Sequence, residues 1–170
     1  MGKKEKKEKK DKSSKKTSSK QVTREDIEKI DNYEKRLPAV LPFARPLAPK
    51  KLNKKILKTV KKASKQKHVR RGVKEVVKAL RKGDKGLVVI AGDISPPDVI
   101  SHLPVLCEDN TVPYLFIPSK EDLGSAGATK RPTSCIMIVP GGGKSNKKNS
   151  GDSEEYKENY DEVVKEISVL

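Results

Sequence analysis

One stretch of the sequence, residues 70–78, combines residue types that suit the recognition of nucleic acid. Its lysines and arginines attract phosphate groups, whereas a phosphate-binding surface repels the carboxylate of Glu75. That residue is the only acid between Lys50 and Asp84. A carboxylate accepts hydrogen bonds from base donors such as guanine N1 and N2, which lysine cannot do. The stretch therefore carries groups for both the backbone and the bases of RNA.

A second interpretation of Glu75 stays open at this point. An acid in the first turn of a helix is favoured by the helix dipole, and Glu75 also stands three residues before Lys78, a spacing that allows an ion pair. Removing the carboxylate separates the two interpretations. Only base recognition predicts weaker RNA binding from a surface that has become more positive.

The positive charge of the chain is concentrated in residues 50–85. This segment holds sixteen Lys and Arg against two acids, a net charge of +14, and the whole chain carries +16. Apolar residues recur through it at helical spacing: Leu52, Ile56, Val60 and Ala63, then Val73, Val76, Val77 and Leu80. The spacing predicts two helices that bury one side and leave Lys74, Lys78 and Arg81 facing out. A rigid cationic face attracts a polyanion, and nucleic acid is the leading candidate.

A second candidate site is the small-residue stretch at 123–132, which begins Leu123-Gly124 and carries Lys130 and Arg131 at its far end. Small residues let a backbone approach a ligand closely, so such a loop can press on an unstacked nucleotide. The same residues also suit a helix C-cap followed by a strand. Both interpretations stay open from the sequence.

The remaining patterns predict an α/β domain. Apolar strands are expected at 86–91, 112–117 and 134–139, and Ser119 is expected to cap a short helix. A helix that opens at 96–98 should bury Val99, Ile100, Leu103, Leu106 and Cys107. Strands that alternate with helices predict a three-layer α/β/α sandwich with a small mixed sheet.

Four regions are expected along the chain. They are a disordered Lys-rich tail (1–22), an RNA-binding α/β/α domain with an N-terminal extension (23–140), a linker (141–152) and an acidic C-terminal helix (153–170). The extension should contain a helix from Thr23 to about Tyr33 and a proline-rich segment, 37–49, that wraps the core. The C-terminal helix has an apolar side made of Tyr156, Tyr160, Val163, Val164 and Ile167.

No catalytic, metal or cofactor site is predicted. Cys107 and Cys135 lack the spacing of zinc ligands and are expected to be reduced core residues, and no catalytic partner stands beside His68 or His102. The glycines at 141–143 lack the spacing of a phosphate-binding loop. No apolar run approaches the roughly 20 residues of a membrane span, and the start lacks the apolar region of a secretory signal. We therefore expect a nonenzymatic, intracellular protein without a membrane contact.

Several motifs, taken together, resemble those of the kink-turn RNA-binding superfamily of ribosomal and small nucleolar ribonucleoprotein proteins. Within residues 37–140 they run in order through Arg71-Gly72-x-Lys74-Glu75-x-x-Lys78, Gly86-Leu-Val-Val-Ile-Ala-Gly-Asp93, His102-Leu-Pro-Val-Leu-Cys-Glu108, Val112-Pro-Tyr114, Ile117-Pro-Ser-Lys120 and Leu123-Gly124. The box H/ACA branch is the most similar, and the acidic end of the chain resembles its fungal members.

The resemblance implies an α/β/α fold and assigns roles to individual positions. Gly72, Glu75 and Lys78 match the helix start that reads sheared G·A pairs, and Leu123 with Gly124 matches the loop that contacts the protruding nucleotide. Lys74 replaces the Asn of the family motif. A point charge cannot make the paired hydrogen bonds of an amide, so a broader preference for irregular RNA stem-loops is expected. The RNA-binding set that we expect is Arg71, Gly72, Lys74, Glu75, Lys78, Leu123, Gly124, Lys130 and Arg131.

The resemblance also implies a biological role, that of a noncatalytic RNA-binding subunit of a box H/ACA small nucleolar ribonucleoprotein. Such a particle guides pseudouridylation and processing of ribosomal RNA in the nucleus and nucleolus. The implied partners are box H/ACA guide RNA, a pseudouridine synthase and small accessory subunits, with a protein contact around residues 95–117. The main alternative is a kink-turn-binding ribosomal or box C/D component, for which Asn is expected in place of Lys74. A recognition module of an RNA-modifying enzyme and a basic chaperone without specific RNA are further alternatives.

Overall fold

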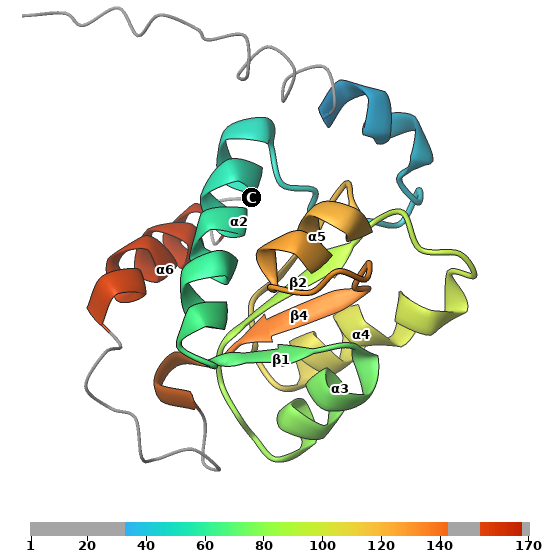
Figure 1. The fold of residues 1–170 in the computed structure, drawn as a ribbon. Coiled ribbons are helices and arrows are strands. Elements are labelled where there is room, and N and C mark those ends of the chain that lie inside the picture. The colour runs from blue at the N-terminus through green and yellow to red at the C-terminus, as the bar shows by residue number, and fades with distance from the viewer. Residues whose placement is uncertain (1–32, 143–153, 168–170) are drawn as a thin grey trace, which may run out of the picture.

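The structure is a computed structural model that describes residues 33–142 and 154–167 (Figure 1). The expected disordered tail, most of the helix from Thr23 and most of the linker lie outside the described residues. The elements, in chain order, are η1 (Leu37–Ala39), α2 (Lys50–Lys65), β1 (Val69–Arg71), α3 (Val73–Arg81), β2 (Leu87–Ala91), α4 (Asp98–Asp109), β3 (Tyr114–Ile117), α5 (Lys120–Ala126), β4 (Cys135–Ile138), η2 (Pro140–Gly142) and α6 (Glu154–Ile167).

The four strands form one mixed sheet in the order β1-β4-β2-β3. β2 and β3 run parallel, whereas β4 is antiparallel to both β1 and β2. The three longer strands lie where the apolar runs predict them. β1 is not predicted, because it has only three residues, two of which are arginines, and it directly follows the first basic helix.

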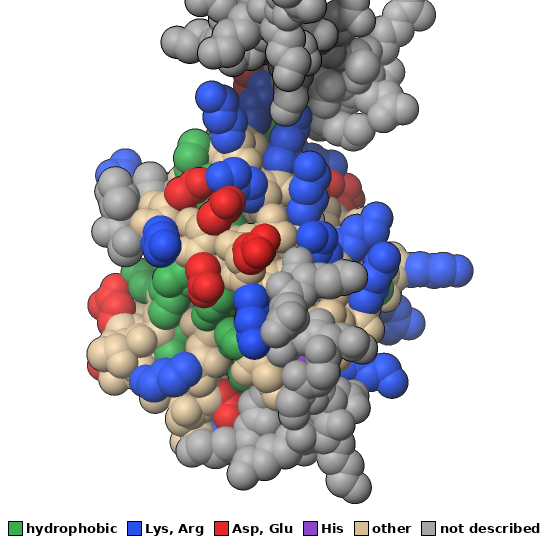
Figure 2. All heavy atoms as spheres, turned by 90° about the vertical axis from the view of Figure 1, so that its left-hand side faces the viewer, with side chains coloured by type: hydrophobic (Ala, Val, Ile, Leu, Met, Phe, Trp, Pro, Cys, Tyr) green, Lys and Arg blue, Asp and Glu red, His purple; other side chains and the backbone are tan. Residues whose placement is uncertain are grey.

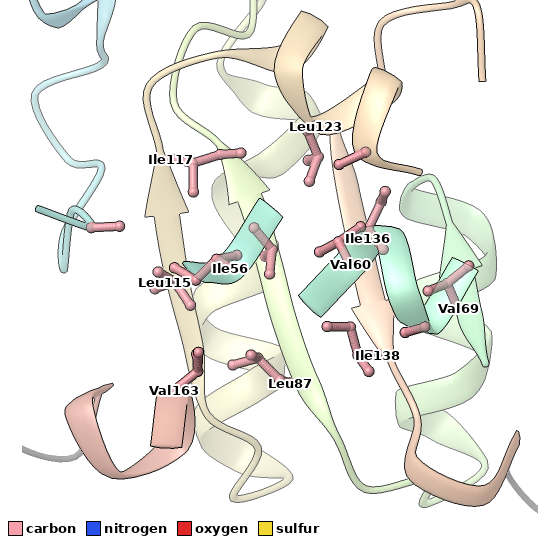
Figure 3. Close-up of a cluster of buried hydrophobic side chains, with 14 of the residues drawn as sticks. Ile56, Val60, Val69, Leu87, Leu115, Ile117, Leu123, Ile136, Ile138 and Val163 are labelled. Atoms are coloured by element: carbon pink, nitrogen blue, oxygen red, sulfur yellow. The ribbon is translucent and has the colours of Figure 1, made fainter. Parts of the chain in front are cut away.

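Helices cover both faces of the sheet, so the predicted α/β/α sandwich is confirmed (Figure 1). Along β2, Leu87 and Val89 face a core formed with α2, α5 and α6, which Figure 3 shows in part. The intervening Val88 and Ile90 face a second core formed with α3 and α4. Burial on both faces explains why β2 is a continuous apolar run instead of an alternating one.

The helix α4 buries most of the predicted apolar set. Ile100, Leu103 and Cys107 are buried, and Leu106 packs against them. Val99 was predicted to be buried, but 41% of it is exposed. Helical spacing puts Val99 on the same side as Leu103, four residues later. Its exposure therefore goes with its place in the first turn of α4, not with its side of the helix.

The proline-rich segment wraps the core, as predicted. Ala44 and Ala48 are buried, and Leu47 forms a parallel bridge with Phe116 in β3. Ala48 N donates to Phe116 O at 2.8 Å, and Phe116 N donates to Pro46 O at 2.8 Å. The segment therefore pairs with the outer edge of β3, whose backbone groups would otherwise be open to another chain.

The acidic helix α6 docks on the same domain, beside α2 (Figure 1). Tyr156 and Val163 are fully buried in the core beneath α2, and Tyr160 and Ile167 pack against that core. The Tyr156 hydroxyl lies 2.8 Å from Nδ1 of the buried His68. The sequence placed no partner beside His68, because Tyr156 stands 88 positions further along the chain.

Both cysteines are buried and free, as expected for reduced core residues. Burial raises the pKa of the Cys107 thiol to about 12, and burial also raises the pKa of Cys135 to about 12. Both thiols therefore stay protonated near neutral pH, which makes them poor nucleophiles.

The buried His68 should make the stability of the fold depend on pH. Burial lowers the pKa of His68 from 6.5, so the unfolded chain binds this proton more readily than the folded one. The free energy of unfolding should therefore be fully retained above pH 6.5 and decrease as the pH falls below it, by at most about 1.4 kcal/mol per pH unit.

Urea unfolding of wild type, His68→Gln and His102→Gln between pH 7.5 and 5.5 tests this. His102 is exposed, so its variant should keep the wild-type decrease, whereas His68→Gln should show a flatter profile. Equal slopes in all three proteins would contradict the assignment to His68.

Candidate nucleic-acid interface

The start of α3 is held in place by the backbone of Gly72. Gly72 N donates to Cys135 O at 2.9 Å, and Gly72 O accepts from Val76 N at 3.1 Å. Its φ is +83°, and a Cβ built here would meet no atom within 4 Å. Glycine is therefore required by the backbone conformation rather than by lack of space. The space above it is open to a ligand.

Glu75 takes part in the local structure and stays accessible. Its Oε2 accepts a hydrogen bond from Arg71 N at 3.2 Å. This contact resembles a capping box, in which a carboxylate in the first turn satisfies a backbone donor just before the helix. The helix-start interpretation of Glu75 is thus confirmed in part, although the contact is with Arg71 N and differs from the predicted pair with Lys78. Because Glu75 is exposed, its carboxylate can also meet a ligand.

The outward face of α3 is cationic, as the periodicity predicts. Lys74, Lys78 and Arg81 are exposed, while Val76 and Leu80 are fully buried. A shallow depression of about 440 Å³ runs along this face, lined by Val73, Lys74, Val77, Lys78, Arg81 and Lys82. A neighbouring depression of about 230 Å³ is lined by Arg70, Glu75, Lys78, Ala79, Lys82 and Asp84. Cationic side chains thus surround the one exposed carboxylate of this helix start.

Arg71, which is expected to bind RNA, also makes a contact within the domain. Its Nη2 donates to Ser64 Oγ at 3.1 Å, and Ser64 Oγ donates to Gly127 O at 3.0 Å. The guanidinium therefore links the end of α2 to the end of α5, and Ser64 is a residue that the sequence did not single out. No local pattern marks Ser64, because Gly127, which accepts its hydroxyl hydrogen bond, stands 63 positions further along the chain.

Leu123 and Gly124 were expected in a loop, and the structure corrects this. Both lie inside α5 and are buried. Leu123 belongs to the apolar core, and a Cβ on Gly124 would come within 2.3 Å of Arg131 O. Their placement argues for a supporting role, in which Gly124 lets the following loop pack directly on α5.

The loop after α5 begins with a helix C-cap, so that interpretation of the small-residue stretch is confirmed. Ala128 has a φ of +56°. Its N–H donates to Ser125 O at 3.2 Å, and Thr129 N donates to Gly124 O at 3.1 Å. This is the Schellman pattern of hydrogen bonds. Lys130 and Arg131 follow directly and are exposed.

The structure brings the two predicted regions to one edge of the domain. The loop at 128–134 leads into β4, and Cys135, the first residue of that strand, holds Gly72. β1 pairs with β4 so that Arg71 lies opposite Ile136. The start of α3 and the cationic loop are therefore neighbours, as Figure 1 shows.

Among residues 33–142 and 154–167, no group of three or more His, Cys, Asp and Glu is placed to hold a metal ion. In this same part of the chain, no helix is long and apolar enough to cross a bilayer.

Comparison with known proteins decides the family. Residues 54–148, more than half of the chain, match the Ribosomal protein L7Ae/L30e/S12e/Gadd45 family. The chain belongs to this family. A solved structure of the Giardia lamblia 15.5kD RNA binding protein is similar to the domain, with a TM-score of 0.66 and 31% sequence identity, and covers 76% of this chain and 98% of that one.

Named relatives extend the match beyond the family domain. The Saccharomyces cerevisiae H/ACA ribonucleoprotein complex subunit NHP2 is 76% identical over 143 residues, which cover 83% of this chain and 90% of that protein. The Schizosaccharomyces pombe subunit nhp2 is 64% identical over 82% of this chain and 89% of its own. The Bos taurus H/ACA ribonucleoprotein complex subunit 2 is 49% identical over 56% of this chain and 55% of its own.

The close packing at Gly124 should make it intolerant of any side chain. Gly124→Ala places a methyl group against the Arg131 carbonyl, and we expect a loss of about 1–3 kcal/mol in the free energy of unfolding. Ser125→Ala, at the exposed neighbouring position, is the matched control and should change stability little. Chemical denaturation of the two variants tests this, and equal stabilities would contradict the packing role of Gly124.

Proposed function

We propose that this chain is the noncatalytic RNA-binding subunit of a box H/ACA small nucleolar ribonucleoprotein that guides pseudouridylation and processing of ribosomal RNA. The names of the relatives that are 76% and 64% identical support the particle. The start of α3 and the cationic loop at 128–134 lie together at one edge of the sheet. This observation is the main support for the RNA-binding role.

This edge offers three kinds of contact to an irregular RNA. Lys74, Lys78 and the loop residues Lys130 and Arg131 are exposed cations that suit phosphate groups. Glu75 supplies an acceptor for base donors within that cationic surface. The open backbone at Gly72 permits close approach of a nucleotide. Recognition by shape and by splayed bases is typical of proteins that bind structured RNA.

This surface supports separate roles for the chain and its partners. The chain holds the guide RNA, and a pseudouridine synthase partner isomerises the target uridine, with small accessory subunits completing the particle. We place the assembly in the nucleus and nucleolus. Lys74, in place of the family's Asn, supports a preference for irregular stem-loops that is broader than strict kink-turn recognition.

The RNAs that bind the chain in cells test the particle. We expect box H/ACA RNAs to dominate the RNA recovered and sequenced after purification of the tagged protein, with box C/D RNAs at the level of an untagged control. Enrichment of box C/D RNAs instead would assign the chain to the alternative particle. The purified chain alone should not isomerise uridine in a substrate RNA.

Replacing Glu75 by Gln tests base recognition separately from charge. The amide oxygen of Gln can still accept the hydrogen bond from Arg71 N, so the helix start should be preserved, but the variant cannot accept two charge-assisted bonds from a base. We expect binding of an irregular stem-loop to weaken by about 1–3 kcal/mol, although the surface becomes more positive.

Binding titrations with the stem-loop and with a regular duplex measure this difference. Affinity for the duplex should rise slightly through charge alone, which provides an internal control. If the variant binds both RNAs more tightly, Glu75 serves only the helix start, and the base-reading role is wrong.

A further inference from the structure

The outward face of α2 is an unbroken row of lysines. Eight of the sixteen residues of α2 are lysine, and none is acidic. At about 100° per residue, these lysines lie on the side of the helix opposite the buried Leu52, Ile56, Val60 and Ala63. Six of them are exposed. Lys55 is bound by acids of α6, and we call four of the others the lysine ridge: Lys51, Lys58, Lys61 and Lys65.

This arrangement works against the stability of the isolated protein. Lysines four residues apart on one helix repel one another. Lys50 and Lys51 also stand in the first turn, where the helix dipole disfavours cations, and no side chain caps this end. A charge pattern that lowers the stability of the fold is typical of a functional surface. The repulsion between these lysines therefore points to a polyanion, outside the domain, that binds them.

The acidic helix α6 does not cover the ridge. Glu162 and Glu166 both bind Lys55, at 3.5 and 2.5 Å, so the acids of α6 lie along one flank of α2. In Figure 2, which faces the side where α6 and α2 lie, acidic side chains in the central and left parts of the surface have lysines and arginines among them, and lysines and arginines predominate toward the right. Within the described residues, the acids of α6 thus neutralise this flank, and Lys51, Lys58, Lys61 and Lys65 stay exposed.

The ridge ends at Lys65, at the end of α2 that contacts Arg71, just before the start of α3. Ser64, at the C-terminal end of α2, accepts a hydrogen bond from Arg71, the residue before Gly72. From that point α2 extends away over about 24 Å. Lys65, Lys58 and Lys51 follow one another at intervals of about 10.5 Å along it, at 1.5 Å per residue. A helical stem that leaves the α3 edge in this direction would run beside the ridge.

We propose that the lysine ridge is a second RNA-binding surface, which contacts the phosphates of a duplex stem flanking the irregular RNA at the α3 edge. This inference rests on the proposed function, because that function places an RNA at this edge. Binding at the ridge is independent of base sequence, since lysine is a point charge that suits phosphate and does not distinguish paired bases in a stem.

An acidic protein is the other polyanion that such a row could meet. Protein interfaces depend on buried aromatic and apolar anchors, and lysine is depleted in them. The exposed large apolar residues of the described chain are Leu37, Phe43, Val99 and Val105, and all four lie outside α2. The ridge therefore offers charge without an anchor, which favours a phosphate backbone.

The double variant Lys58→Gln/Lys65→Gln tests the ridge. Lys157→Gln/Lys165→Gln is the matched control, because it removes the same charge from the neighbouring helix α6. Both proteins are titrated with two RNAs that share an irregular stem-loop and carry either a long or a short flanking duplex. The salt dependence of the dissociation constant is the main measurement.

The binding constant falls as salt rises, and each phosphate contact contributes about 0.7–0.9 to the steepness of that fall. On the long-stem RNA, we expect the plot of the log of the binding constant against log salt to be less steep for the ridge variant than for the control variant, by about 1.4–1.8. On the short-stem RNA, the ridge variant and the control variant should behave alike. Equal behaviour on the long-stem RNA as well would overturn the proposal. So would a ridge variant that retains RNA affinity but loses an acidic protein captured by the wild type.

Glu75→Gln, measured in parallel, separates the two hypotheses. If that change has no effect while the ridge variant still loses long-stem affinity, base recognition at the α3 edge fails and the ridge stands. If the ridge variant weakens both RNAs equally, only overall charge matters, and the ridge as a distinct surface is wrong. Circular dichroism melting confirms that each variant is folded.

Discussion

The whole candidate interface depends on the pairing of β1 with β4. β1 has only three residues, yet it carries the chain from the end of α2 to the edge where the Gly72 amide meets the Cys135 carbonyl. That hydrogen bond fixes the start of α3 next to the loop that leads into β4. Without this pairing, the carboxylate of Glu75 and the cations of Lys130 and Arg131 would have no fixed spatial relation.

Charge is divided among the helices in a way that serves this edge. Eleven of the 24 Lys and Arg residues of the described chain lie in α2 and α3. The acids of α6 lie against one side of α2. The buried contact of Tyr156 with His68 anchors α6 in the core, so its position does not depend on surface ion pairs, which are individually weak. A docked acidic helix can thereby limit where a polyanion binds without competing for the α3 edge.

Patterns with a clear physical period allowed much of this fold to be predicted from sequence. The continuous apolar run of β2 and the helical spacing of α3 are strong local signals, and both lie where they were expected. The failures come from contacts between distant segments. β1 exists only because β4 offers it a partner, and Leu123 and Gly124 became supporting residues because α5 extends through them. Their sequence matched the family's loop motif, which says nothing about which side chains remain accessible.

The segment that pairs with β3 has a consequence for solubility. β3 is the outermost strand of the sheet, and its backbone is hydrogen-bonded by Pro46 and Ala48. A proteolytic cut between this segment and α2 would release the segment and expose a strand of sequence Tyr-Leu-Phe-Ile to other molecules. Unpaired apolar strands of this kind template aggregation. Fragments beginning near residue 50 should therefore retain the cationic edge yet self-associate, because they lack the segment that pairs with β3.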